Sequence, residues 1–209
     1  VASKKRYLFF KRLFDILFSV IVIVLVMSWL LPIAILLIKS GSKGPVFFRQ
    51  KRIGLNGKIF TCIKFRTMIL NTEADEIQAG ENDHRITPAG RFFRKTNIDE
   101  LPQFFNVFAG DMSVVGPRPH MVADCIRFSF VIPSYSFRSL VSPGITGWAQ
   151  INGYHGATND YESIIIRYYW DAQYVRKKGL WVDIKIICST ISQGLQNLLS
   201  NIKKSSKKV

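Results

Sequence analysis

The sequence is poor in cysteine and histidine, the residues from which most metal sites and all disulfide frameworks are built. Its 209 residues include three cysteines, none in a CxxC pair, and three histidines without ligand spacing. This composition excludes a zinc site of the usual spacing and a disulfide framework, and it indicates a reducing compartment. The sequence also lacks internal repeats, and its length fits one domain with a sizeable core.

Acidic residues are few as well: 14 Asp and Glu stand against 29 Lys and Arg, for a formal net charge of +15. Such an excess implies an acidic partner, which is a nucleic acid, an anionic membrane surface or a phosphorylated substrate. A membrane-anchored basic nucleic-acid-binding protein is therefore one hypothesis. Its main support is the net charge, because the sequence has no zinc-finger, RRM or clear helix-turn-helix signature.

One long apolar run lies near the N-terminus, from Leu13 to Ile38. It exceeds the roughly 20 residues with which a helix crosses a bilayer, and it is too long for the apolar part of a signal peptide. Asp15 lies inside this run, where a carboxylate is costly unless it is paired. Arg12 or a base from a globular domain is its expected partner.

Basic residues flank the apolar run on both sides, which is awkward for a simple span because positive charge marks the cytoplasmic side. Pro32 cannot donate a hydrogen bond to the carbonyl of Ser28, so a break or kink is predicted there. The Ser28 hydroxyl is placed to satisfy backbone groups that the bend frees. The residues alone favour equally a kinked spanning helix and a helix that bends and returns to the same face.

The most informative stretch is 94–119, in which Asp99 and Glu100 form an adjacent carboxylate pair. Pro102 fits only the first turn of a helix, which places the helix start at the pair, where the positive dipole end favours negative charge. The helix that follows is predicted to bury one apolar face, formed by Leu101, Phe104, Phe105 and Phe108, with Gln103 and Asn106 on the other side.

This carboxylate pair is compatible with three roles. It can hold Mg²⁺, which prefers carboxylate oxygens and substrate phosphates. Asp99 can act as a nucleophile that forms an aspartyl-phosphate. Alternatively, the two residues only cap a helix, as in a structural membrane-interaction module. Arg94 and Lys95 lie just upstream, and Arg118 lies downstream on a turn stiffened by prolines. Cations beside an acidic pair suit a metal-bound diphosphate.

Other segments are predicted from local patterns. Asn56-Gly57 is a hairpin-turn signal, and the alternating segment 58–68 predicts a strand with Lys64 and Arg66 on one face. That face is either solvated or directed at phosphates.

Two helices are predicted in the C-terminal part, over 161–177 and 180–198. The first carries Asp171, whose ordinary role is a surface acid near Arg167 or Arg176. The second is amphipathic, and it either belongs to the core or lies in a membrane interface with Trp181 as anchor. A short polar surface helix is predicted over 71–79, and a disordered basic tail suited to anionic lipid over 201–209.

Four segments stand out in this order along the chain: GPVFFRQKRIGLNGKIFTCIKFRTM (44–68), DHRITPAGRFFRK (83–95), TNIDELPQFFNVFAGDMSVVGPRP (96–119) and SPGITGWAQINGY (142–154). Together they closely resemble the signature of the bacterial sugar transferases, the monotopic polyprenyl-phosphate phosphoglycosyl transferases. The resemblance covers nearly the whole chain, and its motifs are highly specific.

The resemblance implies an α/β fold, mainly helical with a small sheet, mounted on the membrane as a monotopic protein by a re-entrant helix broken at Pro32. The family often has serine directly before this proline, where the present sequence has Leu31. The expected parts are a basic N-terminus and membrane helix (1–39), a cytoplasmic catalytic domain (40–200) and the tail (201–209). Many larger relatives carry further N-terminal spans, so the chain is expected to be either a natural short form or a trimmed part of a longer protein.

The implied reaction transfers a sugar 1-phosphate from a UDP-sugar to polyprenyl (undecaprenyl) phosphate and releases UMP. It would be the first membrane step in assembling an exopolysaccharide, capsule, O-antigen or glycoprotein glycan. The implied roles are a covalent phosphosugar intermediate on Asp99, Mg²⁺ binding by Glu100 with Asp99, phosphate binding by Lys64, Arg94 and Arg118, and positions near the site for Arg66 and Asp171.

The partners expected from this resemblance are the UDP-sugar, the polyprenyl phosphate and a lipid bilayer, with no nucleic acid. The expected location is the cytoplasmic face of the bacterial inner membrane. The identity of the sugar and the formation of a homo-oligomer remain open at this point.

Overall fold

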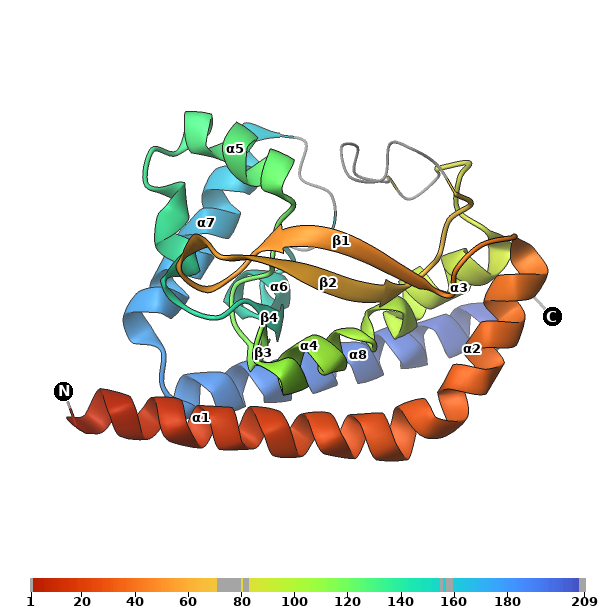
Figure 1. Ribbon diagram of the computed structural model, residues 1–209, viewed down its shortest axis with the longest axis horizontal. Helices are drawn as coiled ribbons and strands as arrows, with labels where there is room; N and C mark the ends of the chain where they lie inside the picture. Colours follow the sequence, from red (N-terminus) through yellow and green to blue (C-terminus); the bar gives the residue numbers. More distant parts are fainter. Residues whose placement is uncertain (1, 71–79, 81–82, 155, 157–159, 207–209) are drawn as a thin grey trace.

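The structure, a computed structural model, describes residues 2–70, 80, 83–154, 156 and 160–206. The helix expected over 71–79 and the last residues of the predicted tail lie outside this part. The described chain is mainly helical with two small sheets (Figure 1). Its elements are α1 (Ala2–Ile21), the π-helical η1 (Val22–Met27), α2 (Ser28–Gly41), β1 (Phe47–Ile53), η2 (Leu55–Gly57), β2 (Ile59–Phe65), α3 (Pro88–Thr96), η3 (Ile98–Glu100), α4 (Gln103–Ala109), β3 (Ser113–Val115), α5 (Val122–Val131), η4 (Tyr135–Leu140), β4 (Gly144–Thr146), α6 (Trp148–Ile151), α7 (Tyr161–Lys177) and α8 (Leu180–Ser206).

The first three elements form one apolar helix that bends where α1 gives way to α2 (Figure 1). Its segment Lys5–Gly41 is long and apolar enough to cross a membrane, and only 17% of its most apolar window is buried, unlike the core helix of a soluble protein. Pro32 lies inside α2, and the Ser28 hydroxyl donates to the carbonyl of Val24 at 2.6 Å. The hydroxyl therefore serves the backbone at the bend, as the sequence predicts. The expected break at Pro32 is wrong, because α2 continues through the proline to Gly41.

The apolar helix also contributes to the core of the globular part. Its buried residues pack in two clusters, one of Met27, Ala34 and Ile38 with Phe65 and Phe93, and one of Val22 with Phe60, Phe104 and Val107. Helix and globular part thus share one interior, in which apolar burial stabilises both.

Asp15, inside α1, is almost fully buried, and it is satisfied by the globular part. It accepts hydrogen bonds from the Ser113 hydroxyl (3.0 Å) and the Val114 amide (2.9 Å). Arg12, its expected partner, instead donates to the carbonyls of Val107 and Phe108. The prediction of a partner was right, but a hydroxyl and a backbone amide take the place of a base.

The described strands form two small sheets of two strands each. β1 and β2 form an antiparallel hairpin whose turn contains Asn56 (φ 53°) and Gly57 (φ 78°), which confirms the hairpin signal. β3 and β4 are parallel, with Ser113 opposite Gly144 and Val115 opposite Thr146.

The predicted buried face of α4 is wrong in part. Phe104 is buried, but Phe105 and Phe108 are 37% and 50% exposed, whereas Gln103 and Asn106 are buried. The physical reason is that the Asn106 side chain is needed at the edge of β2, which turns the two phenylalanines outward beside the apolar helix.

The C-terminal helices match their predictions more closely. α7 has the predicted bounds, and α8 is amphipathic, with Ile186 buried and Trp181 84% exposed. Asp183 at the start of α8 accepts hydrogen bonds from Tyr7 and Lys11 of α1, both at 2.9 Å. α8 continues as a helix to Ser206, into the segment for which the sequence predicts a disordered tail.

Candidate active site

The carboxylate pair lies on η3, a short turn between α3 and α4. Asn97 has a left-handed backbone (φ 56°) and ends α3, which reverses the chain. Leu101 and Pro102 then keep helical backbone angles and lead into α4 at Gln103. The expected helix start at the pair is therefore confirmed as a 3₁₀ turn.

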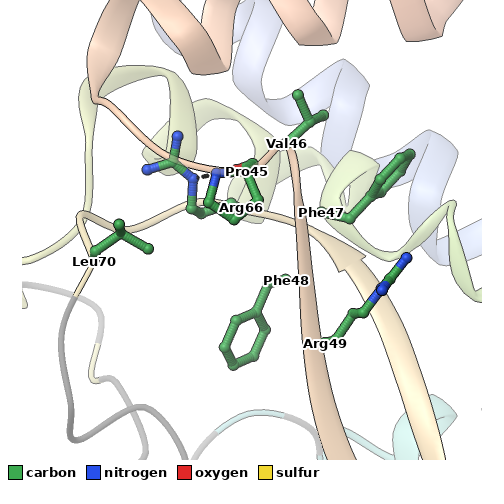
Figure 2. Close-up of a pocket in the computed structure, with 7 residues that line it drawn as sticks. All are labelled: Pro45, Val46, Phe47, Phe48, Arg49, Arg66 and Leu70. Atoms are coloured by element: carbon green, nitrogen blue, oxygen red, sulfur yellow. Dashed lines mark hydrogen bonds between the residues drawn. The ribbon is translucent and has the colours of Figure 1, made fainter.

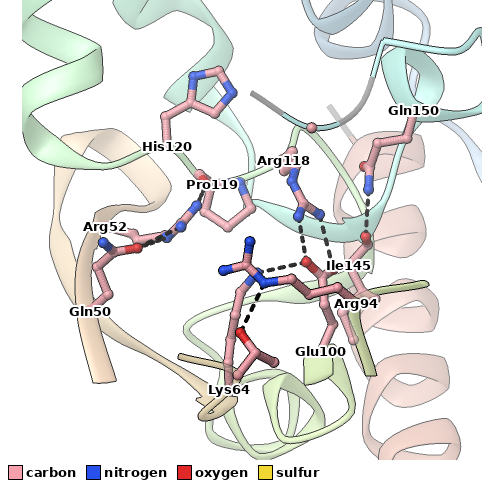
Figure 3. A network of polar contacts seen from close by, with 12 residues as sticks. Gln50, Arg52, Lys64, Arg94, Glu100, Arg118, Pro119, His120, Ile145 and Gln150 are labelled. Carbon is pink, nitrogen blue, oxygen red and sulfur yellow. Dashed lines mark hydrogen bonds and ion pairs between the residues drawn. The ribbon is translucent and has the colours of Figure 1, made fainter. Parts of the chain in front are cut away.

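Glu100 is held by two cations. Lys64 of β2 donates to it at 2.6 Å, and Arg118 donates to both carboxylate oxygens, from Nη1 at 3.0 Å and from Nη2 (Figure 3). Burial alone would raise the pKa of Glu100, but Arg118 and Lys64 outweigh it and hold the pKa well below its usual range. Glu100 is thus a fixed anion that places two cations beside Asp99.

Asp99 has the opposite environment. Its side chain is buried, with 8% exposed, and it makes no hydrogen bond or ion pair with any residue that the structure describes. Burial raises its pKa to about 6; Lys64, Arg118 and Arg94 oppose that rise and Glu100 adds to it. At neutral pH Asp99 is therefore ionised, poorly solvated and unengaged, which are the properties of an activated nucleophile.

Arg94 comes to the site from the last turn of α3. Its Nε donates to the Thr67 hydroxyl at 2.9 Å and its Nη2 contacts the Met68 sulfur at 3.2 Å. It forms no ion pair with a carboxylate of any described residue. The charge of Asp99 still acts on it, and Figure 3 shows it beside Lys64 and Glu100. Its cation is thus held near the pair by neutral partners and remains available for a phosphate.

The loop that carries Arg118 is fixed by the parallel sheet. The Gly116 amide donates to the Thr146 carbonyl, and the Gly144 amide donates to the Pro117 carbonyl, both at 2.9 Å. A Cβ at Gly116 would come within 2.4 Å of the Ser142 carbonyl oxygen, so only glycine permits this approach. The rigidity expected from the prolines is thus reinforced by backbone pairing.

Asp171 lies behind this loop rather than at the carboxylate pair. It is 1% exposed and accepts from Arg138 Nε (2.9 Å) and Nη2 (2.7 Å), while Arg138 Nη2 also donates to the Arg118 carbonyl (2.6 Å). It is neither a surface acid nor a direct contact of the pair. Asp171 is connected to the site indirectly, because Arg138 binds both Asp171 and the backbone of Arg118. Arg138 was not identified from the sequence.

The comparison with known proteins decides the family. The family model described as "Bacterial sugar transferase" matches residues 6–197. The chain belongs to the bacterial sugar transferase family.

Relatives of this chain are named for different sugars. It is 48% identical to the UDP-glucose:undecaprenyl-phosphate glucose-1-phosphate transferase of Klebsiella pneumoniae, over 90% of the chain and 40% of the relative. It is 44% identical to the UDP-N-acetylgalactosamine-undecaprenyl-phosphate N-acetylgalactosaminephosphotransferase of Aeromonas hydrophila (88% and 43%) and 36% identical to the undecaprenyl-phosphate galactose phosphotransferase of Salmonella typhimurium (90% and 41%). The chain thus spans about 40% of the length of these relatives.

Arg66 does not join the carboxylate pair, although the resemblance implied a position near the site. It is buried, and its guanidinium donates to Ser42, to the Lys43 carbonyl and to the Pro45 carbonyl, which fixes the loop between α2 and β1. It borders a surface pocket of about 480 Å³ whose other lining residues are Pro45, Val46, Phe47, Phe48, Arg49 and Leu70 (Figure 2). No residue of the carboxylate pair or its cations lines that pocket.

His120 lies in the interior, directly after Pro119 of the loop that carries Arg118. It is buried against Tyr135, whose hydroxyl lies 2.6 Å from Nδ1, and Arg167 lies 3.4 Å from Nε2. Burial and the surrounding arginines hold its pKa well below the usual range, so it is neutral. Its ring contacts Tyr135 and Arg167 and not the carboxylate pair.

The carboxylate pair fits Mg²⁺ in ligand type but not as a complete cage. No group of three His, Cys, Asp or Glu side chains that could hold a metal occurs among the described residues. Mg²⁺ commonly uses one or two carboxylates together with substrate phosphates and water. In the part of the chain that the structure describes, Asp99 has no partner to give up, whereas Glu100 would have to exchange Lys64 or Arg118 for the metal.

Proposed function

We propose that this chain transfers a sugar 1-phosphate from a UDP-sugar to undecaprenyl phosphate, or a similar polyprenyl phosphate, through a covalent intermediate on Asp99. Its membership in the bacterial sugar transferase family and the names of its relatives support the reaction. The relatives differ in their sugar, so the proposal leaves the sugar unassigned.

The observation that carries the proposal is the contrast within the carboxylate pair. Glu100 is neutralised by Lys64 and Arg118, whereas Asp99 has no side-chain partner among the described residues and a pKa of about 6. A capping residue would bond to a backbone amide, and no such bond to Asp99 is found among the described residues. The site therefore presents one reactive carboxylate to a phosphate that three cations can hold.

In the first proposed step, an Asp99 oxygen attacks the sugar-bearing phosphorus of the UDP-sugar. The new O–P bond forms as the bond from that phosphorus to the bridging oxygen breaks, and UMP leaves with the electron pair. Lys64, Arg94 and Arg118 stabilise the charge on the phosphoryl oxygens. In the second step, an oxygen of the polyprenyl phosphate attacks the same phosphorus and restores the carboxylate.

Mg²⁺ belongs to this proposal as the cation that neutralises the substrate diphosphate when bound, with Glu100 and Asp99 as its protein ligands. The residues of the chain then orient the phosphates. A covalent intermediate also lets a soluble donor and a lipid acceptor use one site in turn.

We also place the chain at the cytoplasmic face of the bacterial inner membrane, on a re-entrant helix. Both ends of the apolar helix are bound to one globular part: Lys11 donates to Asp183 and to the Val115 carbonyl, and the loop after Gly41 is held by Arg66. A straight span would place its ends on opposite sides of a hydrocarbon layer about 30 Å thick. Attachment of both ends to the same part therefore supports a helix that enters and returns.

The test is a transferase assay on detergent-solubilised protein with undecaprenyl phosphate, Mg²⁺ and a panel of UDP-sugars, comparing wild type with Asp99→Asn. UMP release with one sugar, absent in the variant, is expected, together with a phosphosugar adduct on Asp99 detected by mass spectrometry when the acceptor is omitted. Equal UMP release by both proteins would remove Asp99 as the nucleophile. No release with any sugar would contradict the proposed reaction.

A further inference from the structure

The buried side of α4 carries two carboxamides in very different states. Asn106 is fully used: its Oδ1 accepts from the Ile63 amide (3.0 Å), and its Nδ2 donates to the Thr61 carbonyl (2.7 Å). Gln103 is equally buried, with 2% exposed, yet its side chain makes no hydrogen bond to any described residue. Asn106 thus has a structural role at the edge of β2, and Gln103 has none of this kind.

The position of Gln103 follows from the backbone. The backbone hydrogen bonds of η3 and of the turn after it join residues three apart, from Leu101 N to Ile98 O and from Phe104 N to Leu101 O, so residues three apart share a face here. Gln103 therefore lies on the face of Glu100, one turn along from the carboxylate pair. It also lies between two contacts with β2, that of Asn106 with Thr61 and Ile63 and that of Glu100 with Lys64.

A buried carboxamide without a partner is unfavourable, and natural proteins rarely keep one without reason. The side-chain polar atoms that are both sealed and unpaired in the described chain are Gln150 Oε1 and Arg167 Nε. The Gln103 carboxamide is not among them, so its polar atoms keep a small exposed area although the side chain as a whole is buried. That combination suits a group whose partner is a ligand.

We propose that Gln103 binds the substrate, with its Nε2 donating a hydrogen bond to a phosphoryl oxygen of the group that is transferred to Asp99. This inference rests on the proposed function and adds a fourth donor to its site. A carboxamide donates without adding positive charge to a site that already holds Lys64, Arg94 and Arg118. Neutral Asn and Gln donors of this kind stabilise developing oxyanions in other enzymes.

The test uses Gln103→Met, which keeps the length of the side chain and removes the donor. Loss of one such donor typically lowers the rate about 10²-fold, so kcat/KM for the UDP-sugar should fall by that order. The Tm in detergent should stay level or rise, because no protein partner loses a hydrogen bond. Gln193→Met is the matched control: its Nε2 donates to the Ile151 carbonyl on the surface, and kcat/KM should be unchanged.

Two results would overturn the inference: wild-type kcat/KM in Gln103→Met, or a Tm lowered by several degrees, which would indicate a structural role. A second readout does not need turnover. The rise in Tm caused by UDP with Mg²⁺ should be smaller in Gln103→Met than in wild type, and equal rises would also overturn it. If wild type transfers no sugar, the proposed function fails by itself, and this binding readout still decides the role of Gln103.

Discussion

Replacing Asp99 by Asn should make the protein more stable while it abolishes activity. Burial raises the pKa of Asp99 from 3.8 to about 6, so the folded state holds its charge at a cost. At pH 7 a pKa rise of this size lowers the free energy of unfolding by ~3 kcal/mol, because each pKa unit is worth about 1.4 kcal/mol. For a chain of this length that equals a Tm gain of roughly 6–12 °C. The neutral amide avoids the cost.

The pH dependence gives this prediction its sign. Between pH 4 and 6 the folded state binds more protons at Asp99 than the unfolded state, so wild-type stability falls as the pH rises through that window. Asp99→Asn lacks this loss. The difference in Tm between variant and wild type should therefore be small at pH 4, grow up to about pH 6 and stay constant above pH 7. Differential scanning fluorimetry in detergent measures it, and wild-type kcat/KM should fall below about pH 6 as Asp99 is protonated.

Glu100→Gln is the matched control, because Glu100 is adjacent to Asp99 but is stabilised as an anion by Lys64 and Arg118. Loss of that buried carboxylate leaves Lys64 and Arg118 uncompensated, which should cost about 3–5 kcal/mol at every pH from 5 to 8. If Asp99→Asn is less stable than wild type, or if its Tm difference is the same at pH 4.5 and 7.5, the carboxylate is not strained by burial and the argument for an activated nucleophile fails.

Three further predictions concern the surroundings of the site. Asp171→Asn should destabilise the protein by about 3–5 kcal/mol, because it leaves Arg138 buried without its partner. The double variant Asp171→Leu with Arg138→Met should recover most of the Tm loss. A double variant no more stable than the single one would refute the pairing. Gly116→Ala should cost ~1–3 kcal/mol and lower kcat/KM, because its methyl group meets the Ser142 carbonyl; wild-type kinetics would show that the loop moves freely. Single cysteines at Lys5 and Ser40, in a chain whose own cysteines are replaced, should react with a membrane-impermeant maleimide only in inside-out vesicles; labelling from opposite sides would establish a span.

Local patterns in the sequence predicted much of this structure. The Asn56-Gly57 turn, the strand after it and the helix 161–177 each follow from signals carried by neighbouring residues, and all three are confirmed. The approach of Lys64 and Arg118 to Glu100 could be predicted only through the family resemblance. Spacing along the chain does not reveal that a strand, a turn and a loop meet.

The failures have a physical cause. Phe105 and Phe108 were predicted to be core residues because the apolar face of a helix is normally buried in a soluble protein. That rule does not hold for α4, which lies beside an exposed apolar helix, and its buried face carries the polar side chains of Gln103 and Asn106. Arg66 and Arg138 were misjudged or missed because their partners are backbone carbonyls and a distant acid, which no periodicity encodes.

The shared core of helix and globular part has a practical consequence for anyone who wants a water-soluble version of this protein. Deleting residues 1–41 would leave Phe65, Phe93 and Phe104 without the side chains that cover them, and would remove the carboxylate that Ser113 and Val114 bind. The truncated domain would therefore lose part of its own interior. Solubility must be sought by changing the outward face of the helix, whose exposed side chains include Leu17, Val24, Trp29 and Leu36.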